Sequence, residues 1–545
     1  MPTLNWLGDQ QAKHTARRVP YRLLETVSQH GDINAQNWLI QGDNLDALKA
    51  LLPFYAGKVK CIFIDPPYNT KSAFEHYDDN LEHSQWLSMM YPRLELLREL
   101  LSEDGFIIVH IDDSESHYLK VMLDEVFNRK NYHLSIYVQV RYGNKTLAED
   151  SDYQKIIEQA FVYSKGIAKP YKEKEDYSID KFVHKINELA PGEIVTLGGK
   201  KVEIFKPGSF SIEEGEPSLF GLKGTWATGS LIKQKASSGE FLHLNISPRK
   251  EIDGLGCLYK VYGIGEDGLG YRYFTGPKKA TATKGLFYSG IPLKRVEELK
   301  LGMAKKEKPI LNFYDWSGSF GNCRQEGGVD FRAGKKPEAY VKKMLDLFSQ
   351  PGDLVLDSFL GSGSTAAVAH KTNRQYIGIE MGPQAETHCL SRLESVIGGE
   401  NTGISETVNW LGGGGFRYMK LGEPVFLDDG SINPDIRFNT LASYVWFLET
   451  GQPHTNAQFA SPLLGITGED DNAVAYVLLF NGILGDRRAN GGNVLTSVLW
   501  PYLQSLAPEH KGRWVIYGEA ARMTEARRRS HQISFKQIPY DIRMK

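Results

Sequence analysis

Cysteine is scarce in this sequence of 545 residues. Its four cysteines, Cys61, Cys257, Cys323 and Cys389, lie far apart, and no two of them form a C-x-x-C pair. This spacing excludes a disulfide scaffold and indicates neither a zinc ribbon nor a dithiol redox site. Isolated cysteines are typical of a reducing compartment, so we expect the protein in the cytoplasm.

An excess of charge and long apolar runs are also missing. The 64 Lys and Arg residues are balanced by 66 Asp and Glu residues, which gives a formal net charge of −2. This balance argues against a protein that coats nucleic acid by bulk attraction, although it is compatible with a local basic surface. No run approaches the roughly 20 apolar residues that span a bilayer, and the first residues contain no apolar signal segment. We expect a globular protein of about three or four domains without membrane association.

Several catalytic motifs are absent as well. Because the sequence contains no G-x-x-x-x-G-K-[ST], we do not expect it to hydrolyse nucleotides for motor work. The absence of G-x-S-x-G and H-E-x-x-H disfavours a serine hydrolase and a zinc protease. We interpret His110, Asp112 and Asp113 as a strand edge with capping carboxylates rather than as metal ligands, and we predict no metal site.

Strand and helix patterns alternate in two parts of the chain. An apolar strand begins at Lys60 and is ended by prolines, and helical patterns cover residues 84–101 and 114–128. Strands that are apolar on both faces usually lie inside a parallel sheet, so the pattern predicts an α/β sheet covered by helices. The predicted segments are a leader (1–36), the first part of the sheet (37–165), a β-rich insertion (166–311), the second part of the sheet (312–398) and an α/β C-terminal region (399–545).

The first motif that could carry chemistry is Asp65-Pro66-Pro67-Tyr68, at the carboxyl end of an apolar strand. Ligands of open parallel sheets bind at this end of the strands. The two prolines make the loop rigid and withhold two N–H donors, while Asp65 is an acceptor and Tyr68 an aromatic face. This set suits a planar base with an exocyclic amino group, since two acceptors take its N–H bonds and a ring stacks on it. The alternative is a strand followed by a proline turn, with Asp65 as a helix cap.

The second motif is a glycine turn between a strand and a helix, Asp357-Ser358-Phe359-Leu360-Gly361-Ser362-Gly363-Ser364-Thr365. Glycines let the backbone approach a ligand closely and open the helix N-terminus towards it. Glu380 ends the next strand, where a ribose diol would be bound. A dinucleotide site for hydride transfer is disfavoured, because Ala366 occupies the place of the third glycine.

Two segments are locally basic. Residues 278–308 contain nine Lys and Arg against three Glu, a net charge of +6, and residues 501–545 carry a net charge of +5. By composition alone, a solvated surface is as good an interpretation of the first segment as a binding surface.

The two motifs together resemble the S-adenosylmethionine-dependent amino-group DNA methyltransferases, in particular the N6-adenine enzymes. The proline motif precedes the glycine motif, which resembles the β-class, circularly permuted order. Further segments, GDNLDALKALLPFYAGKVKCIFIDPPYNT, KPEAYVKKMLDLFSQPGD, GGGGFRYMKL and SFKQIPYDIR, resemble the modification subunits of type III restriction systems. The resemblance begins near Asn37 and weakens through the insertion. It implies a Rossmann-like methyltransferase sheet with helices on both faces, and a target-recognition role for the insertion.

The resemblance also implies roles for single residues. Asp65 and the carbonyl of Pro66 would accept hydrogen bonds from the adenine N6 amino group, Pro67 would stiffen the loop, and Tyr68 would stack on the base. The implied binding residues for S-adenosylmethionine are Asp43, Lys336, Pro337, Asp357, Phe359, Gly361, Gly363, Thr365 and Glu380. To flip a base out, the protein must hold the duplex. We expect these DNA contacts from Lys278, Lys279 and Lys284 in the basic run.

The implied activity is methyl transfer to N6 of a flipped adenine in double-stranded DNA, without a metal. The expected partners are DNA, a second copy of the chain in a homodimer, and a restriction subunit with nuclease and translocase activity; the C-terminal region would contact one of these. Two alternatives stay open: N4-cytosine methylation, and a DNA-recognition and assembly subunit with incidental methylation. Asp rather than Ser before Pro66 favours adenine in the family that the chain resembles.

Overall fold

The computed structural model describes most of the chain and divides it into two compact units. Unit 1 comprises Met1–Tyr171 and Ile310–Lys545, and unit 2 comprises Lys172–Pro309. None of the described helices is both long and apolar enough to cross a membrane. The described residues are 3–69, 82–144, 152–233, 237–282, 284–331, 334–427, 431–454, 459–481, 483 and 493–543.

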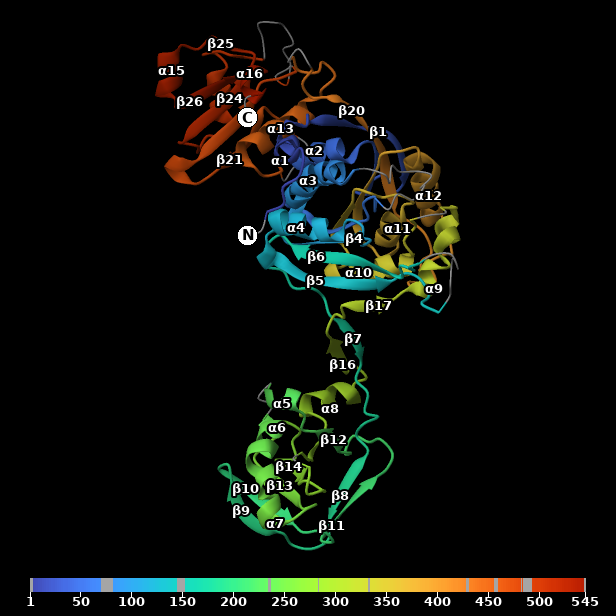
Figure 1. The fold of residues 1–545 in the computed structure, drawn as a ribbon. Coiled ribbons are helices and arrows are strands. Elements are labelled where there is room, and N and C mark those ends of the chain that lie inside the picture. The colour runs from blue at the N-terminus through green and yellow to red at the C-terminus, as the bar shows by residue number, and fades with distance from the viewer. Residues whose placement is uncertain are drawn as a thin grey trace. The chain divides into compact units, whose positions relative to one another are not determined.

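Unit 1 is built on a ten-stranded sheet with the order β1-β20-β2-β19-β18-β3-β4-β6-β5-β17 (Figure 1). The six strands from β20 to β4 are parallel to one another, whereas β1, β6 and β5 each run antiparallel to a neighbour. In sheet order the strands are β1 (Arg22–Gly31), β20 (Gly415–Pro424), β2 (Trp38–Gln41), β19 (Gln375–Glu380), β18 (Leu354–Asp357), β3 (Val59–Ile64), β4 (Leu101–Ile111), β6 (Ile157–Ser164), β5 (Tyr132–Gln139) and β17 (Phe313–Asp315).

Both faces of this sheet are covered by helices, which confirms the predicted fold class. Successive side chains of a strand point to opposite faces. In β3, Ile62 and Ile64 pack into one core with α1 to α4, while Cys61 and Phe63 pack into another with α10 to α12. The helices are α1 (Asp9–Arg18), α2 (Asn44–Tyr55), α3 (His83–Leu100), α4 (Ser116–Phe127), α9 (Ser317–Phe320), α10 (Glu338–Phe348), α11 (Ser364–Lys371) and α12 (Ser391–Ile397). The helices predicted over residues 84–101 and 114–128 correspond to α3 and α4.

The chain changes direction between β3 and β18, which are adjacent and parallel with Val355 opposite Cys61 and Leu356 opposite Ile62. From β3 the chain passes through α3 to β4 on one side, and from β18 it passes through α11 to β19 on the other. The two connections therefore diverge and leave a crevice at the carboxyl ends of the two strands, which is where open α/β sheets bind ligands.

Two predicted segment boundaries do not coincide with the ends of the sheet. Strand β1 lies in the expected leader, residues 1–36, and pairs with β20 of the expected C-terminal region, residues 399–545. None of the residues of β1 is buried, and its sequence carries no apolar strand pattern. It owes its structure to a partner strand almost 400 residues further along the chain, which no local pattern reveals.

Unit 2 is rich in β-structure, as expected for the insertion, and its bounds lie slightly inside 166–311. Its antiparallel six-stranded sheet has the order β12-β15-β14-β13-β10-β9 and is accompanied by two ribbons, β11-β8 and β16-β7. The strands are β7 (Glu173–Asp176), β8 (His184–Glu188), β9 (Glu193–Leu197), β10 (Lys200–Phe205), β11 (Phe210–Glu214), β12 (Lys223–Trp226), β13 (Leu258–Tyr262), β14 (Tyr271–Thr275), β15 (Leu286–Ser289) and β16 (Lys305–Lys308). The helices are α5 (Gly229–Lys233), α6 (Ser237–Phe241), α7 (Lys250–Asp253) and α8 (Leu293–Lys300).

The C-terminal part of unit 1 carries a smaller α/β sheet with the order β21-β22-β24-β26. Tyr444 of α13 packs edge-on against Tyr21, with ring centroids 4.5 Å apart, so this part packs against the segment that directly precedes β1. The strands are β21 (Leu463–Thr467), β22 (Val474–Leu478), β23 (Val494–Leu495), β24 (Arg513–Gly518), β25 (Ala520–Ala521) and β26 (Ile533–Gln537). The helices are α13 (Phe438–Thr450), α14 (Trp500–Ser505), α15 (Glu525–Ser530) and α16 (Tyr540–Arg543).

Unit 2 should fold when residues 172–309 are expressed alone. It has its own buried core around Val202, Tyr259 and Phe274, and its two ends are paired in the β7–β16 ribbon. A compact unit of this kind is expected to unfold cooperatively, with a free energy of unfolding of about 5 kcal/mol or more. Urea unfolding followed by circular dichroism checks this; a gradual loss of signal without a transition would show that the unit depends on the rest of the chain.

Candidate functional site

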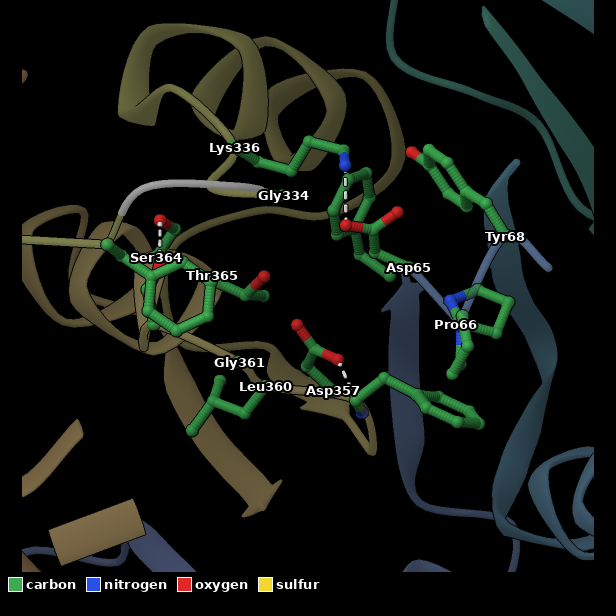
Figure 2. A pocket seen from close by; sticks show the side chains of 15 residues that line it. Asp65, Pro66, Tyr68, Gly334, Lys336, Asp357, Leu360, Gly361, Ser364 and Thr365 are labelled. Carbon is green, nitrogen blue, oxygen red and sulfur yellow. Dashed lines mark hydrogen bonds and ion pairs between the residues drawn. The ribbon is translucent and has the colours of Figure 1, made fainter. Parts of the chain in front are cut away.

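The proline motif and the glycine turn line one cavity at the crevice between β3 and β18 (Figure 2). The empty space between its walls is about 750 Å³ when the part open to solvent is included. One wall is Asp65-Pro66-Pro67-Tyr68, the second is the turn from Asp357 to Thr365, and the third comprises Phe331, Gly334 and Lys336.

A hydrogen bond from helix α3 holds the proline loop in place. Trp86, which is fully buried, donates its indole N–H to the carbonyl of Pro67 at 2.8 Å. Helix α3 itself is capped by Glu82, so the alternative interpretation of Asp65 as a helix cap is wrong. The loop is therefore rigid both by its proline content and by this hydrogen bond.

Asp65 has one oxygen satisfied and the other open. Lys336 Nζ lies 2.5 Å from Asp65 Oδ2 and 5.0 Å from the centre of the Tyr68 ring (Figure 2). Asp65 Oδ1 is buried and has no hydrogen-bond partner in the part of the chain that the structure describes. A buried acceptor without a donor costs free energy, so in a cavity wall this oxygen is available to a donor of a bound molecule.

Tyr68 completes this wall, and its hydroxyl is held by a residue that no motif singles out. Tyr68 Oη donates to Glu158 Oε2 at 2.9 Å, and His110 Nε2 lies 2.7 Å from the same oxygen. Burial raises the pKa of Tyr68 well above its usual range, and the charges of Asp65 and Glu158 raise it further. His110 is thus fully buried in a hydrogen-bond network, in contrast to the predicted strand edge. Only the antiparallel pairing of β4 with β6 brings it to Glu158.

The other two residues of that predicted strand edge do not cap the helix that follows, because the cap residue of α4 is Glu115. Asp112 accepts the backbone N–H of Ser114 at 2.7 Å in the turn before α4, and both Asp112 and Asp113 form ion pairs with Lys155.

The glycine turn has the backbone geometry that glycine permits. Gly361 and Gly363 have φ angles of 57° and 82°, in the left-handed region. The N–H of Gly361 donates to Glu380 Oε2 at 2.7 Å, which ties the turn to the end of β19. Gly363 precedes α11, and a Cβ atom there would lie 3.4 Å from the backbone of Cys389. The left-handed φ is therefore what favours glycine at position 363, which is not among the residues that line the cavity.

Asp357 is a buried acid at the end of β18. Its Oδ1 accepts the backbone N–H of Phe359 at 2.9 Å. Burial is the largest influence on its pKa and raises it to about 7, although hydrogen bonds from Thr365 and Phe359 oppose this rise. The carboxyl group is therefore sensitive to any charge that enters the cavity.

Asp43, Pro337 and Glu380 lie beside the cavity rather than in its wall. Asp43 caps α2 by accepting the N–H of Leu45 and pairs with Arg93, and Pro337 is the cap residue of α10. Glu380 is buried and used by Gly361. The predicted residues that the cavity brings together are Asp65, Pro66, Pro67, Tyr68, Lys336, Asp357, Phe359, Gly361 and Thr365.

The predicted DNA-contact lysines lie in unit 2. Lys278, Lys279 and Lys284 are exposed in the connection between β14 and β15. The rest of the basic run is different, because β16 pairs in register with the acidic strand β7: Lys305, Lys306 and Lys308 lie opposite Asp176, Glu175 and Glu173. The run from 278 to 308 is thus not one continuous basic surface.

Comparison with known proteins gives one family. The DNA methylase family matches residues 59–389. The probable type III restriction-modification enzyme HindVI Mod subunit of Haemophilus influenzae is 33% identical over 422 residues, which cover 72% of this chain and 55% of that protein. The type III restriction-modification enzyme StyLTI Mod subunit of Salmonella typhimurium is 26% identical over 416 residues, covering 68% and 56%. The chain thus spans about half the length of these relatives.

Among solved structures, the PvuII DNA methyltransferase (cytosine-N4-specific) matches 69% of this chain and 91% of its own, with 13% identity and a TM-score of 0.33.

The raised pKa of Asp357 predicts a pH-dependent stability that Asp357→Asn should remove. Between its ordinary pKa of 3.8 and about 7, the folded protein binds a proton at this residue that the unfolded chain has released. The free energy of unfolding should therefore fall as the pH rises through this window, by up to about 4 kcal/mol. Urea unfolding between pH 4 and 8 measures it. If the free energy of unfolding depended on pH in the same way in the wild type and the variant, the raised pKa of Asp357 would be contradicted.

Proposed function

This chain belongs to the DNA methylase family, and on that premise we propose that it transfers a methyl group from S-adenosylmethionine to N6 of an adenine flipped out of double-stranded DNA. The observation that carries the proposal is Asp65 Oδ1, a buried acceptor without a described donor, beside the Tyr68 ring in the cavity wall. The similarity to Mod subunits supports a role as the modification subunit of a type III restriction-modification system.

The cavity is suited to S-adenosylmethionine beside the base. When bound, this cofactor supplies a methyl group on a positively charged sulfur. Asp65 and Asp357 provide carboxyl groups for a cation, Gly361 allows close backbone approach, and Phe359 and Thr365 line the same wall. We assign Asp43 and Glu380, at the carboxyl ends of the neighbouring strands β2 and β19, to the nucleoside end of the cofactor.

The residues of the proline loop would act on the amino group of the base. The N6 lone pair is shared with the ring, which makes N6 a poor nucleophile. Asp65 Oδ1 and the carbonyl of Pro66 would accept hydrogen bonds from its two N–H groups and favour the positive charge that develops on nitrogen during transfer, a charge that the nitrogen loses by releasing one of these two protons. Lys336 holds Asp65 by the other oxygen, so Oδ1 stays available. The rigid loop would keep the nitrogen in line with the methyl group.

Tyr68 would offset part of the cost of base flipping. Extruding a base from the duplex costs a few kcal/mol of stacking and pairing, and a ring in the pocket restores some stacking. The exocyclic amine of cytosine fits the same two acceptors, and Asp at position 65 supports adenine through the resemblance given above.

The proposed partners follow from this reaction. DNA would contact the exposed lysines of the β14–β15 connection, and the C-terminal part would contact DNA, a second copy of the chain in a homodimer, or a restriction subunit with nuclease and translocase activity. The proposed location is the cytoplasm, where the four cysteines, all buried and free, would stay reduced.

The purified chain should label adenine in unmethylated plasmid DNA when it is given S-adenosylmethionine with a radioactive methyl group. Digestion to nucleosides is expected to recover the label in N6-methyladenine, and Asp65→Ala should lower the rate about 100- to 1,000-fold because a transition-state acceptor is lost. Label in N4-methylcytosine would overturn the adenine assignment. Sequence-specific DNA binding without any label would instead indicate a recognition and assembly subunit.

Replacing Lys278, Lys279 and Lys284 by alanine should weaken DNA binding and flatten its salt dependence. Each phosphate contact contributes about 0.9 to the slope of log K against log salt, so the slope should fall by up to about 2.7. The matched control replaces Lys305, Lys306 and Lys308, which face acidic residues across the ribbon and should leave the slope nearly unchanged. Equal slopes for the wild type and the first variant would show that these three lysines do not contact DNA phosphates and are only solvated surface residues.

A further inference from the structure

Three polar residues behind Tyr68, of which His110 and Tyr340 are fully buried and Glu158 is partly buried, have no part in the transfer step described above. Glu158 lies on β6, His110 on β4 and Tyr340 on α10. Glu158 Oε2 accepts the Tyr68 hydroxyl, and His110 Nε2 lies 2.7 Å from the same oxygen. His110 Nδ1 in turn lies 2.6 Å from Tyr340 Oη. The four side chains form one line of hydrogen bonds from the cavity wall into the core.

The charge of Glu158 determines which groups in this line donate hydrogen bonds and which accept them. Burial, the largest influence, would raise the pKa of Glu158, but hydrogen bonds from His110 and Tyr68 and the positive charge of Lys336 outweigh it, and the pKa is about 2. The group is therefore ionised near neutral pH and can only accept hydrogen bonds. Both the Tyr68 hydroxyl and His110 Nε2–H must then donate to it, so the tyrosine hydroxyl points to one defined oxygen.

The result is that Tyr68 is held at two points. Its backbone follows Pro67, whose carbonyl is bound by Trp86, and its hydroxyl is bound by Glu158. The Tyr68 ring lies nearly parallel to the His110 ring, with an interplanar angle of 9° and centroids 6.3 Å apart. A ring fixed at both ends keeps its plane before any base arrives, and ordering it costs nothing at the moment of binding.

We propose that Glu158 is a positioning residue for methyl transfer, which fixes the plane of the Tyr68 ring through its hydroxyl and is itself oriented by His110. The inference rests on the proposed function and adds to it, because it assigns a role to β4 and β6 that no motif indicates. Glu158 acts through Tyr68 and does not touch the base.

A competing role for Glu158 is purely electrostatic. The carboxylate lies near Lys336 and could stabilise positive charge in the cavity without Tyr68. The two roles differ in a double-mutant cycle: a positioning role disappears when Tyr68 has no hydroxyl, whereas an electrostatic role persists. Tyr68→Phe keeps the stacking ring and removes only the hydroxyl.

The test compares wild type, Glu158→Ala, Glu158→Gln, Tyr68→Phe and the double variant Tyr68→Phe with Glu158→Ala. The single-turnover rate of methyl transfer to unmethylated plasmid DNA and the affinity for S-adenosylmethionine are measured for each. Glu158→Ala and Tyr68→Phe should each lower the rate roughly 10- to 100-fold, the range in which such supporting contacts act, and leave cofactor affinity within about twofold. The rate of the double variant should be at most about twofold below that of the slower single variant. Glu158→Gln keeps an acceptor and should lie between wild type and Glu158→Ala.

Asp113→Asn is the matched control, because Asp113 is an exposed carboxylate just beyond the end of β4 and should leave the rate unchanged. Multiplying effects in the double variant would overturn the positioning role in favour of the electrostatic one. Normal rates in both Glu158 variants, or a parallel loss of cofactor affinity, would overturn the inference as well. A wild type that transfers no label at all would instead contradict the proposed function, so the two failures are distinguishable.

Discussion

The pairing of β3 with β18 is the contact on which the site depends. These strands are almost 300 residues apart in sequence, yet they lie side by side with Leu356 opposite Ile62. Because the chain leaves them in opposite directions, the proline loop and the glycine turn open towards each other rather than being covered by a common connection. The buried side chains on both faces of β3 hold this pairing inside two cores, so the two chemical motifs are placed by hydrophobic packing and not by contacts between themselves.

Several ionisable side chains lie at or behind the wall of this cavity, where burial disfavours their charged forms. Lys336 and Asp65 offset each other's desolvation, and His110 forms a hydrogen bond with Glu158. Two carboxyl groups are not fully satisfied by these contacts. One oxygen of Asp65 has no donor among the described residues, and the pKa of Asp357 is raised to about 7. Groups that are costly to bury and are not fully satisfied cluster at functional sites, which supports a cavity built for an amine and a cation.

The sequence predicted the elements that carry chemistry better than the contacts between them. The proline loop and the glycine turn follow strands whose apolar runs are visible locally, so their position at the carboxyl edge could be inferred. Strand β1 could not, because it is mostly polar and depends on β20. Glu158 and His110 meet only through strand register, and the ion pair of Lys336 with Asp65 spans two distant segments. The pairing of β16 with the acidic strand β7, which interrupts the basic run, is likewise supplied by the fold.

Adenine methylation by this chain is tested by sequencing the modified bases in DNA from cells that express it, with cells expressing Asp65→Ala as the reference. This sequencing reports the modified base and its sequence context together, and it requires no assumption about the recognition site. We expect N6-methyladenine at one short sequence in the first DNA and its loss in the second. N4-methylcytosine at such a sequence, or the same adenine methylation with both chains, would contradict it.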